Sequence, residues 1–255
     1  MQKLLIATLL NILLFSSFTL SGFLSPQTLN VGPEIYHTKR IRHGGTHQKG
    51  YLYGTTLQYE HLSKYGLYLS AQGRLAYGKL SGFSGKGHRI SSHQLDSELE
   101  GSLGGSYSFN KFTLASFGGG GYYYGINKYG HPTPIPLKFH DTFSFLTLGS
   151  LIQWNPSGEF SMTLTHKVRF MVKGQSKIMN DPNYDTQTLP MNEQRHYEIS
   201  LSQDFKLPLK RGLYGFSFTS FYRYRHYGGR ANFPFDFIDT KFIIYGINAS
   251  ATYLF

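Results

Sequence analysis

The sequence has no cysteine among its 255 residues, which excludes disulfide bonds and a lipid anchor on an amino-terminal cysteine. Beyond residue 22, no apolar run approaches the roughly 20 residues that a membrane-spanning helix needs. Acidic residues are few, since 14 Asp and Glu stand against 25 Lys and Arg, for a formal net charge of +11. A helical membrane protein is therefore excluded, and the stability of the fold must come from a continuous hydrogen-bonded sheet.

The amino terminus has the composition of a secretory signal peptide. Lys3 supplies its only charge, Leu4 to Leu14 form a short apolar run, and small residues between Ser16 and Gly22 offer cleavage positions. An uncleaved membrane anchor is the alternative, but the apolar run is short for a spanning helix. We predict a signal peptide over residues 1–22 and a single domain over residues 23–255, because no linker-like stretch divides the remainder.

Aromatic residues and glycine are abundant, with 20 Tyr, 21 Phe and 29 Gly. Most of the chain also alternates apolar and polar residues with a period of two, as a strand with one apolar and one wet face requires. Tyr51, Tyr53 and Leu57, for example, alternate with Gly54 and Gln58. Ten such segments can be recognised, although 112–124, with its glycine run, and 142–154, apolar on both faces, are less clear. The expected strands are 29–42, 50–60, 67–78, 95–109, 112–124, 142–154, 160–170, 197–205, 214–225 and 243–255.

The connections between these segments alternate between short and long. Brief turns are expected at 62–65, 110–111, 155–158 and 207–211, and longer links at 43–49, 80–94, 125–141, 173–192 and 227–240. Short periplasmic turns opposite long outer loops are typical of bacterial outer-membrane barrels. The sequence therefore predicts an all-β fold, a closed up-and-down antiparallel transmembrane β-barrel of about ten strands.

The carboxyl-terminal strand carries a motif of its own. Tyr253 and Phe255 alternate on one face, and the chain stops at the aromatic residue. This resembles the terminal strand by which outer-membrane barrels are recognised for insertion. With the alternating segments, residues 22–255 resemble small bacterial outer-membrane β-barrel proteins. The resemblance implies an outer-membrane location, with membrane lipid, lipopolysaccharide and the barrel-assembly machinery as partners, and no nucleic acid.

Ten-strand barrels of this class include proteases of the omptin type and adhesins of the Opc type. An omptin would need acidic pairs and an Asp-His couple at the outer rim, and no such motif is recognised in the sequence. The histidines are expected on lipid-facing strand ends (His37, His61, His166) or near outer loops, and no His-x-His pair occurs. We therefore expect no enzyme activity, no catalytic residues, no cofactor and no metal site.

Charged residues on the polar strand faces should project into a narrow lumen, where opposite charges need partners to offset desolvation. Arg74 lies on the strand just before Glu98 and Glu100, so these three should come within reach. A packed polar core is one interpretation, and a small-solute channel or porin-like pore through a charged lumen is the other. The expected lumen charges are Glu34, Arg40, Glu60, Arg74, Asp96, Glu98, Glu100, Lys167, Arg169, Glu198, Arg223 and Arg225.

Much of the excess positive charge falls in or near the expected outer loops. Cations there could contact lipopolysaccharide phosphates by charge-assisted hydrogen bonds, or simply keep the loops solvated. The sequence thus favours a non-enzymatic outer-membrane barrel whose outer loops have a structural or surface-binding role, adhesin-like or in contact with a polyanion, and it names no ligand. The cations are Arg42, Lys49, Lys86, Arg89, Lys128, Lys138, Lys173, Lys177, Arg195, Arg230 and Lys241.

Overall fold

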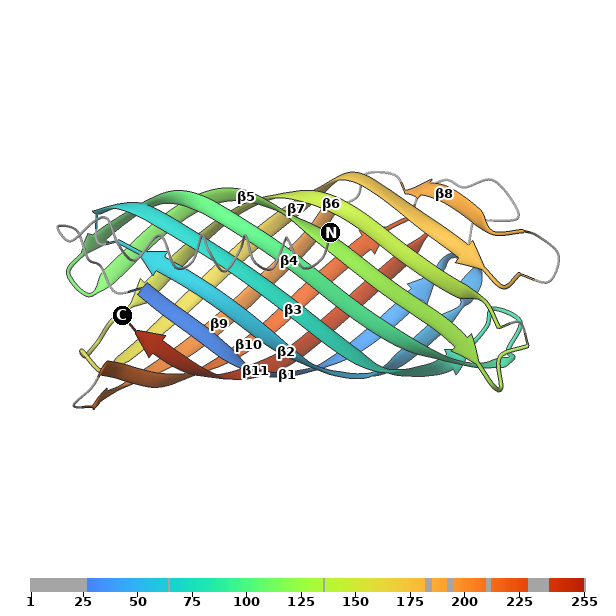
Figure 1. The fold of residues 1–255 in the computed structure, drawn as a ribbon, viewed down its shortest axis with the longest axis horizontal. Coiled ribbons are helices and arrows are strands. Elements are labelled where there is room, and N and C mark those ends of the chain that lie inside the picture. Colours follow the sequence, from blue (N-terminus) through green and yellow to red (C-terminus); the bar gives the residue numbers. More distant parts are fainter. Residues whose placement is uncertain are drawn as a thin grey trace.

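The computed structural model describes residues 27–63, 65–134, 136–181, 185–191, 195–209, 212–228 and 239–254. The expected signal peptide, Arg230 and Phe255 lie outside these residues. The described chain forms a long barrel of antiparallel strands (Figure 1). Its strands are β1 (Gln27–Arg42), β2 (His47–Leu62), β3 (Tyr65–Phe83), β4 (Arg89–Phe109), β5 (Phe112–Gly130), β6 (Lys138–Trp154), β7 (Phe160–Met179), β8 (Gln187–Met191), β9 (Arg195–Leu209), β10 (Gly212–Tyr227) and β11 (Thr240–Leu254).

Ten of these strands close the barrel. Each pairs with its neighbours along the chain, β7 pairs with β9, and β1 pairs with β11 from Thr28 opposite Leu254 to Arg42 opposite Thr240. Closure removes the exposed edges that an open sheet would present. The predicted fold class is confirmed. Within the described residues, no helix is long and apolar enough to cross a membrane.

The two ends of the barrel differ. The short connections lie at the end that also holds Gln27 and Leu254, which we call the turn end, and the opposite end is the loop end (Figure 1). At the loop end the strands run further than the sequence predicted: β3 continues to Phe83 and β4 begins at Arg89, so the expected 80–94 link shrinks to residues 84–88. Where the structure describes them, the expected links 80–94, 125–141 and 173–192 consist largely of paired strand, because Ser- and Gly-rich segments can still form ladder hydrogen bonds.

A β-bulge changes the parity of β7 near the loop end. The β6 register shifts between Ser144, which faces Lys173, and Phe145, which faces Met171, so Val172 is an extra residue. Beyond the bulge toward the loop end, β7 pairs with β8, a strand that lies within the expected 173–192 link. Inward-facing positions therefore switch from odd numbers, such as Met171, to even numbers, such as Ile178.

Glycines on the inner face explain why the alternation of apolar and polar residues was less clear in β5 and β6. Gly121 on β5 faces the lumen, and a Cβ there would lie 2.4 Å from the Phe145 ring of β6. Gly149 on β6 meets the Phe117 ring of β5 at the same distance. Each inward aromatic ring thus lies over a glycine of the adjacent strand, which puts apolar residues on the inner face where alternation alone expects polar ones.

The outer face is an apolar band with aromatic residues at both ends. Leu57, Leu75, Leu99, Leu148 and Ile247 are among its exposed members. An exposed apolar surface that encircles a protein is far larger than the patches on soluble monomers, and aromatic girdles mark the two interfaces of a lipid bilayer. The loop-end girdle includes Tyr51, Tyr53, Tyr77, Tyr122, Tyr197, Tyr222 and Tyr245, and the turn-end girdle includes Tyr107, Phe109, Phe112, Trp154, Tyr214 and Tyr253.

Candidate functional site

The centre of the lumen holds ten buried charged side chains, which we call the charge cluster. Five are acidic and five are basic, so the cluster is electrically balanced. All side chains in its ion pairs are at most 11% exposed. Its members are Glu34, Asp96, Glu98, Glu100, Glu198, Arg74, Lys167, Arg169, Arg223 and Arg225.

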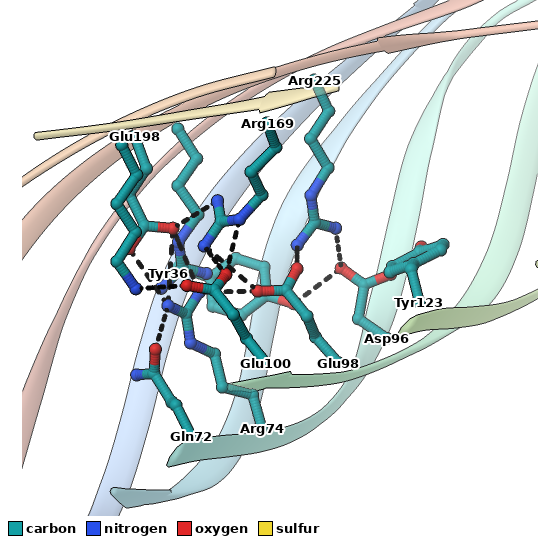
Figure 2. Close-up of polar contacts among 12 residues, drawn as sticks. Tyr36, Gln72, Arg74, Asp96, Glu98, Glu100, Tyr123, Arg169, Glu198 and Arg225 are labelled. Carbon is teal, nitrogen blue, oxygen red and sulfur yellow. Dashed lines mark hydrogen bonds and ion pairs between the residues drawn. The ribbon is translucent and has the colours of Figure 1, made fainter. Parts of the chain in front are cut away.

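Three of the ion pairs cross the full width of the barrel, and Arg225 makes two of them, with Glu98 and with Asp96. Glu98 on β4 and Arg225 on β10 are 2.5 Å apart, and these strands are diametrically opposite in the ring of ten. Arg74 on β3 and Glu198 on β9 are also on opposite walls, and their side chains meet at 3.1 Å. Figure 2 shows the carboxylates of Glu98 and Glu100 pointing across to the guanidinium groups. The charge cluster therefore spans the lumen rather than lining its wall.

Arg169 joins three carboxylates at the centre. Its guanidinium lies 2.7 Å from Glu100, 3.0 Å from Glu198 and 3.5 Å from Glu98. Glu100 also accepts a hydrogen bond from the Lys167 ammonium at 2.7 Å. Such shared, charge-assisted contacts give Arg169 three carboxylates and Glu100 two cations, which offsets the desolvation of these charges in a poorly hydrated lumen.

Asp96 closes the cluster toward the loop end. It accepts hydrogen bonds from the hydroxyls of Tyr36 at 2.8 Å and Tyr123 at 2.6 Å, and from the Gln94 amide at 2.9 Å. Arg225 lies 3.6 Å away. These partners come from four strands, so Asp96 links the charges to the aromatic side chains of Tyr36 and Tyr123 (Figure 2).

An aromatic layer lies next to the charge cluster on the loop-end side. Tyr123 stacks on Phe143 with ring centroids 4.5 Å apart, Phe143 lies 5.5 Å from Tyr227, and Tyr227 stacks on Phe242 at 5.4 Å. The Arg225 guanidinium covers the Tyr123 ring at 4.8 Å. Alternation did not predict this layer, although two of its rings, Tyr123 and Phe143, lie in the two segments where the alternation was less clear, 112–124 and 142–154.

Toward the turn end, the lumen opens into a polar cavity of about 150 Å³. Hydroxyl and amide side chains line most of it, among them Thr56, Ser161, Thr163 and Ser250. Its inner end is formed by members of the charge cluster, including Glu198. The cavity therefore leads to the cluster and ends there.

Solved structures resemble this barrel. The outer membrane protease OmpT from Escherichia coli matches with a TM-score of 0.52 and 9% identity, covering 90% of this chain and 96% of that one. The translocator domain of the autotransporter NalP from Neisseria meningitidis matches with a TM-score of 0.49 and 9% identity, covering 100% and 98%. No protein-family model matches the chain, and no curated protein matches its sequence.

The fold is that of a bacterial outer-membrane β-barrel. At 9% identity, the likeness to OmpT shows a shared fold and nothing of its activity. The expectation of this broad class is confirmed, and no single family is identified within it.

All twelve expected lumen charges face inward, but two are outside the charge cluster. Arg40 lies nearer the loop end, where it donates to Gln48, to Ser92 at 3.3 Å and to the Tyr129 hydroxyl at 3.1 Å. Glu60 lies in the polar cavity. The side-chain hydrogen bonds of these two residues go to Gln48, Ser92 and Tyr129 and to Gln58, none of which belongs to the cluster.

The expected partners of Arg74 are only partly observed. Arg74 lies 3.6 Å from Glu98, as adjacent strands allow, but its shorter contact is with Glu198 across the lumen. Glu100 instead pairs with Lys167 and Arg169. Register explains the outcome: Arg74 is directly opposite Glu98 in the β3–β4 ladder, and Glu100 is one inward position further toward the turn end.

The cations expected in outer loops are mostly on strands. Lys86 is in the 84–88 connection, whereas Lys49, Lys128 and Lys241 lie on outward strand faces. Arg42 is buried in the lumen, with its guanidinium 4.1 Å above the Phe139 ring. The loop cations were misplaced because the strands extend beyond the boundaries read from the sequence.

The described histidines do not gather into one site. At the loop end, His226 Nε2 lies 2.6 Å from an Asp239 carboxylate oxygen. His93 stacks on Tyr77 on the outer face. Across the part of the chain that the structure describes, no group of three or more His, Asp or Glu side chains is arranged to hold a metal ion.

Proposed function

We propose that this protein is a non-conducting, non-enzymatic barrel of the outer membrane, with a structural or surface-binding role at its loop end. The observation that carries the proposal is the charge cluster, whose three transverse ion pairs join opposite walls of the lumen. An ion could pass this level only by opening pairs that are nearly fully buried. The aromatic layer beside the cluster adds a second obstruction.

The outer-membrane location is supported by the outer surface. A closed sheet satisfies its backbone hydrogen bonds internally, which a spanning structure must do because lipid offers no partners. The apolar band and the two aromatic girdles match the depth profile of a bilayer. In this location, Tyr253 on the terminal strand would face lipid, where the barrel-assembly machinery could recognise it during insertion.

A small-solute channel is the second candidate, because the polar cavity forms an opening into the lumen at the turn end. That entrance ends at Arg74, Glu198 and Arg223, which are held by mutual ion pairs. A channel would require the charge cluster to open. The contacts favour the closed barrel.

Planar-bilayer recording of the refolded mature protein tests the proposal. We expect no steady conductance from the wild-type barrel. Glu98→Ala combined with Arg225→Ala removes both transverse pairs that Arg225 makes, with Glu98 and with Asp96, without changing the net charge. We expect this variant to pass small ions if it folds. Heat-modifiable migration on gels serves as the folding check, since a closed barrel resists detergent until it is heated.

Steady, reproducible channels in the wild-type protein would contradict the closed lumen. A matched control is Ser217→Ala combined with Thr219→Ala, which widens the polar cavity on the same strand as Arg225 and leaves the charge cluster intact. This control should remain silent. If the control and the Glu98→Ala, Arg225→Ala variant conduct equally, the charge cluster is not the barrier to ions.

A further inference from the structure

Positive charge is concentrated on the outer surface of the barrel near the loop end. Among the described strand residues, every Asp and Glu faces the lumen, while ten Lys and Arg face outward toward the loop end. We call these ten the basic belt. Its members are Lys39, Lys49, Lys79, Arg89, Lys128, Lys138, Lys173, Lys177, Arg195 and Lys241.

Strand register makes the basic belt continuous. Lys39 is directly opposite Lys49 across β1 and β2, and Lys128 is directly opposite Lys138 across β5 and β6. Between these pairs, His93 on β4 faces both Lys79 on β3 and Lys128 on β5. Neighbouring strands are about 4.8 Å apart, so these side chains form a row around the barrel.

The other strands continue the row. Lys241 on β11 pairs with Ile41, two residues from Lys39, and with His226 on β10. Lys177 on β7 faces His140 on β6. Arg195 begins β9. Each of the ten barrel strands thus contributes a Lys, an Arg or a His to this level of the outer surface.

This arrangement is unfavourable without an external anion. Like charges directly opposite each other on adjacent strands destabilise the pairing. No outward-facing carboxylate on the described strands offsets them, because the acidic residues of the strands are all inside. Asp239, just before β11, pairs with His226 at 2.6 Å, but no strand carboxylate faces the Lys and Arg side chains of the belt, so anions from the surroundings are the natural partners of these cations.

The position of the belt indicates which anion is available. Lys49, Lys79 and Arg195 each lie two residues beyond a girdle aromatic, namely Tyr51, Tyr77 and Tyr197. Girdle aromatics lie at the lipid headgroup level, so the belt is at the depth of the headgroup phosphates.

We infer that the basic belt binds the phosphate groups of phosphorylated glycolipids in the outer leaflet, of the lipid A type, around the circumference of the barrel. The inference rests on the proposed membrane placement and deepens the surface role proposed above. Lys and Arg bind phosphate oxygens by charge-assisted hydrogen bonds, and several cations on adjacent strands can share one headgroup with two phosphates.

Native mass spectrometry of the refolded mature protein tests this inference. The protein is offered lipid A, dephosphorylated lipid A or phosphatidylglycerol in the same micelles, and bound lipids are counted. We expect retention of lipid A above the other two, decreasing as salt is raised. The double variant Lys79→Gln, Lys128→Gln should retain lipid A about 25-fold more weakly, since each cation near an anionic surface contributes about fivefold to binding.

The matched control is the double variant Lys111→Gln, Lys206→Gln, which removes two positive charges at the turn end. Lys111 donates to the Pro156 carbonyl, and Lys206 lines the polar cavity, so neither belongs to the belt. This control should retain lipid A as the wild type does. Equal retention of phosphorylated and dephosphorylated lipid, equal binding of phosphatidylglycerol, or equal loss in the two variants would overturn the inference.

The two proposals fail in different ways. A barrel that conducts but retains lipid A contradicts the closed lumen and leaves the basic belt standing. A barrel that does not conduct and does not selectively retain lipid A contradicts only the inference that the basic belt binds lipid phosphates. A protein that shows no heat-modifiable migration and stays out of membranes contradicts the placement on which both depend.

Discussion

Glu198 offers the sharpest test of the charge cluster. Its carboxylate lies 3.1 Å from Arg74, 3.0 Å from Arg169 and 2.9 Å from Arg223, and its side chain is 5% exposed. Glu198→Gln keeps the size and shape of the side chain, so it creates no cavity. The substitution removes one negative charge from a balanced set of ten and leaves an excess positive charge in the centre of the barrel.

The expected cost follows from burial. Breaking a buried ion pair by removing one partner costs about 3 to 5 kcal/mol, because the remaining charge is left desolvated. In a hydrated pore, the same pair would be worth about 0 to 1 kcal/mol. Since Glu198 has three basic partners, we expect a loss at the upper end of the first range.

The assay is urea unfolding of the barrel in lipid vesicles, followed by the fluorescence of Trp154, the only tryptophan in the sequence. Trp154 lies on the outer face at the turn end and reports on the bilayer interface. Glu60→Gln is the control, because Glu60 lies in the polar cavity with Gln58 as its hydrogen-bond partner at 3.2 Å. We expect it to cost less than about 1 kcal/mol.

A second variant separates charge balance from general disruption. Adding Arg74→Gln to Glu198→Gln restores neutrality, while Glu98 keeps Arg169 and Arg225 as partners. We expect the double variant to be more stable than the sum of the two single losses predicts. If Glu198→Gln costs no more than Glu60→Gln, or if the losses are simply additive, the packed polar core is refuted.

Three further predictions concern placement, packing and insertion. The mature protein should fractionate with the outer membrane and migrate faster on gels before heating, and recovery from the periplasm would contradict the barrel. Gly121→Ala should lower stability by about 1 to 3 kcal/mol because its Cβ meets the Phe145 ring, whereas Gly120→Ala on the outer face should cost less. Phe255→Asp should reduce assembled protein more than Leu254→Asp, whose side chain faces the lumen, and equal effects would contradict the terminal-strand parity.

The sequence by itself determined the class of fold. Period-two alternation sets which residues face inward, because successive side chains on a strand point to opposite sides. Glu34, Arg74, Glu198 and Arg225 were therefore assigned to the lumen from parity alone. Alternation is a local property, and it was sufficient to recognise all ten barrel strands.

Strand ends and the interruption of β7 were not determined in this way. Where the strands extend beyond the lipid, both faces can be polar, and the sequence no longer distinguishes strand from loop. The extra residue, Val172, cannot be recognised from the alternation of β7 alone, because a bulge is defined by the residues that pair with it on β6. The boundaries of the loop end therefore required the tertiary structure.

Only the closed barrel decided which charges meet. Glu98 and Arg225 are 127 residues apart in the chain, and they touch because their strands face each other across the ring. The same closure turned Lys39, Lys79 and Lys138, which the sequence spreads over a hundred residues, into one row on the outer surface. Partner choice in a barrel depends on strand number and stagger, which are properties of the whole sheet and of no single segment.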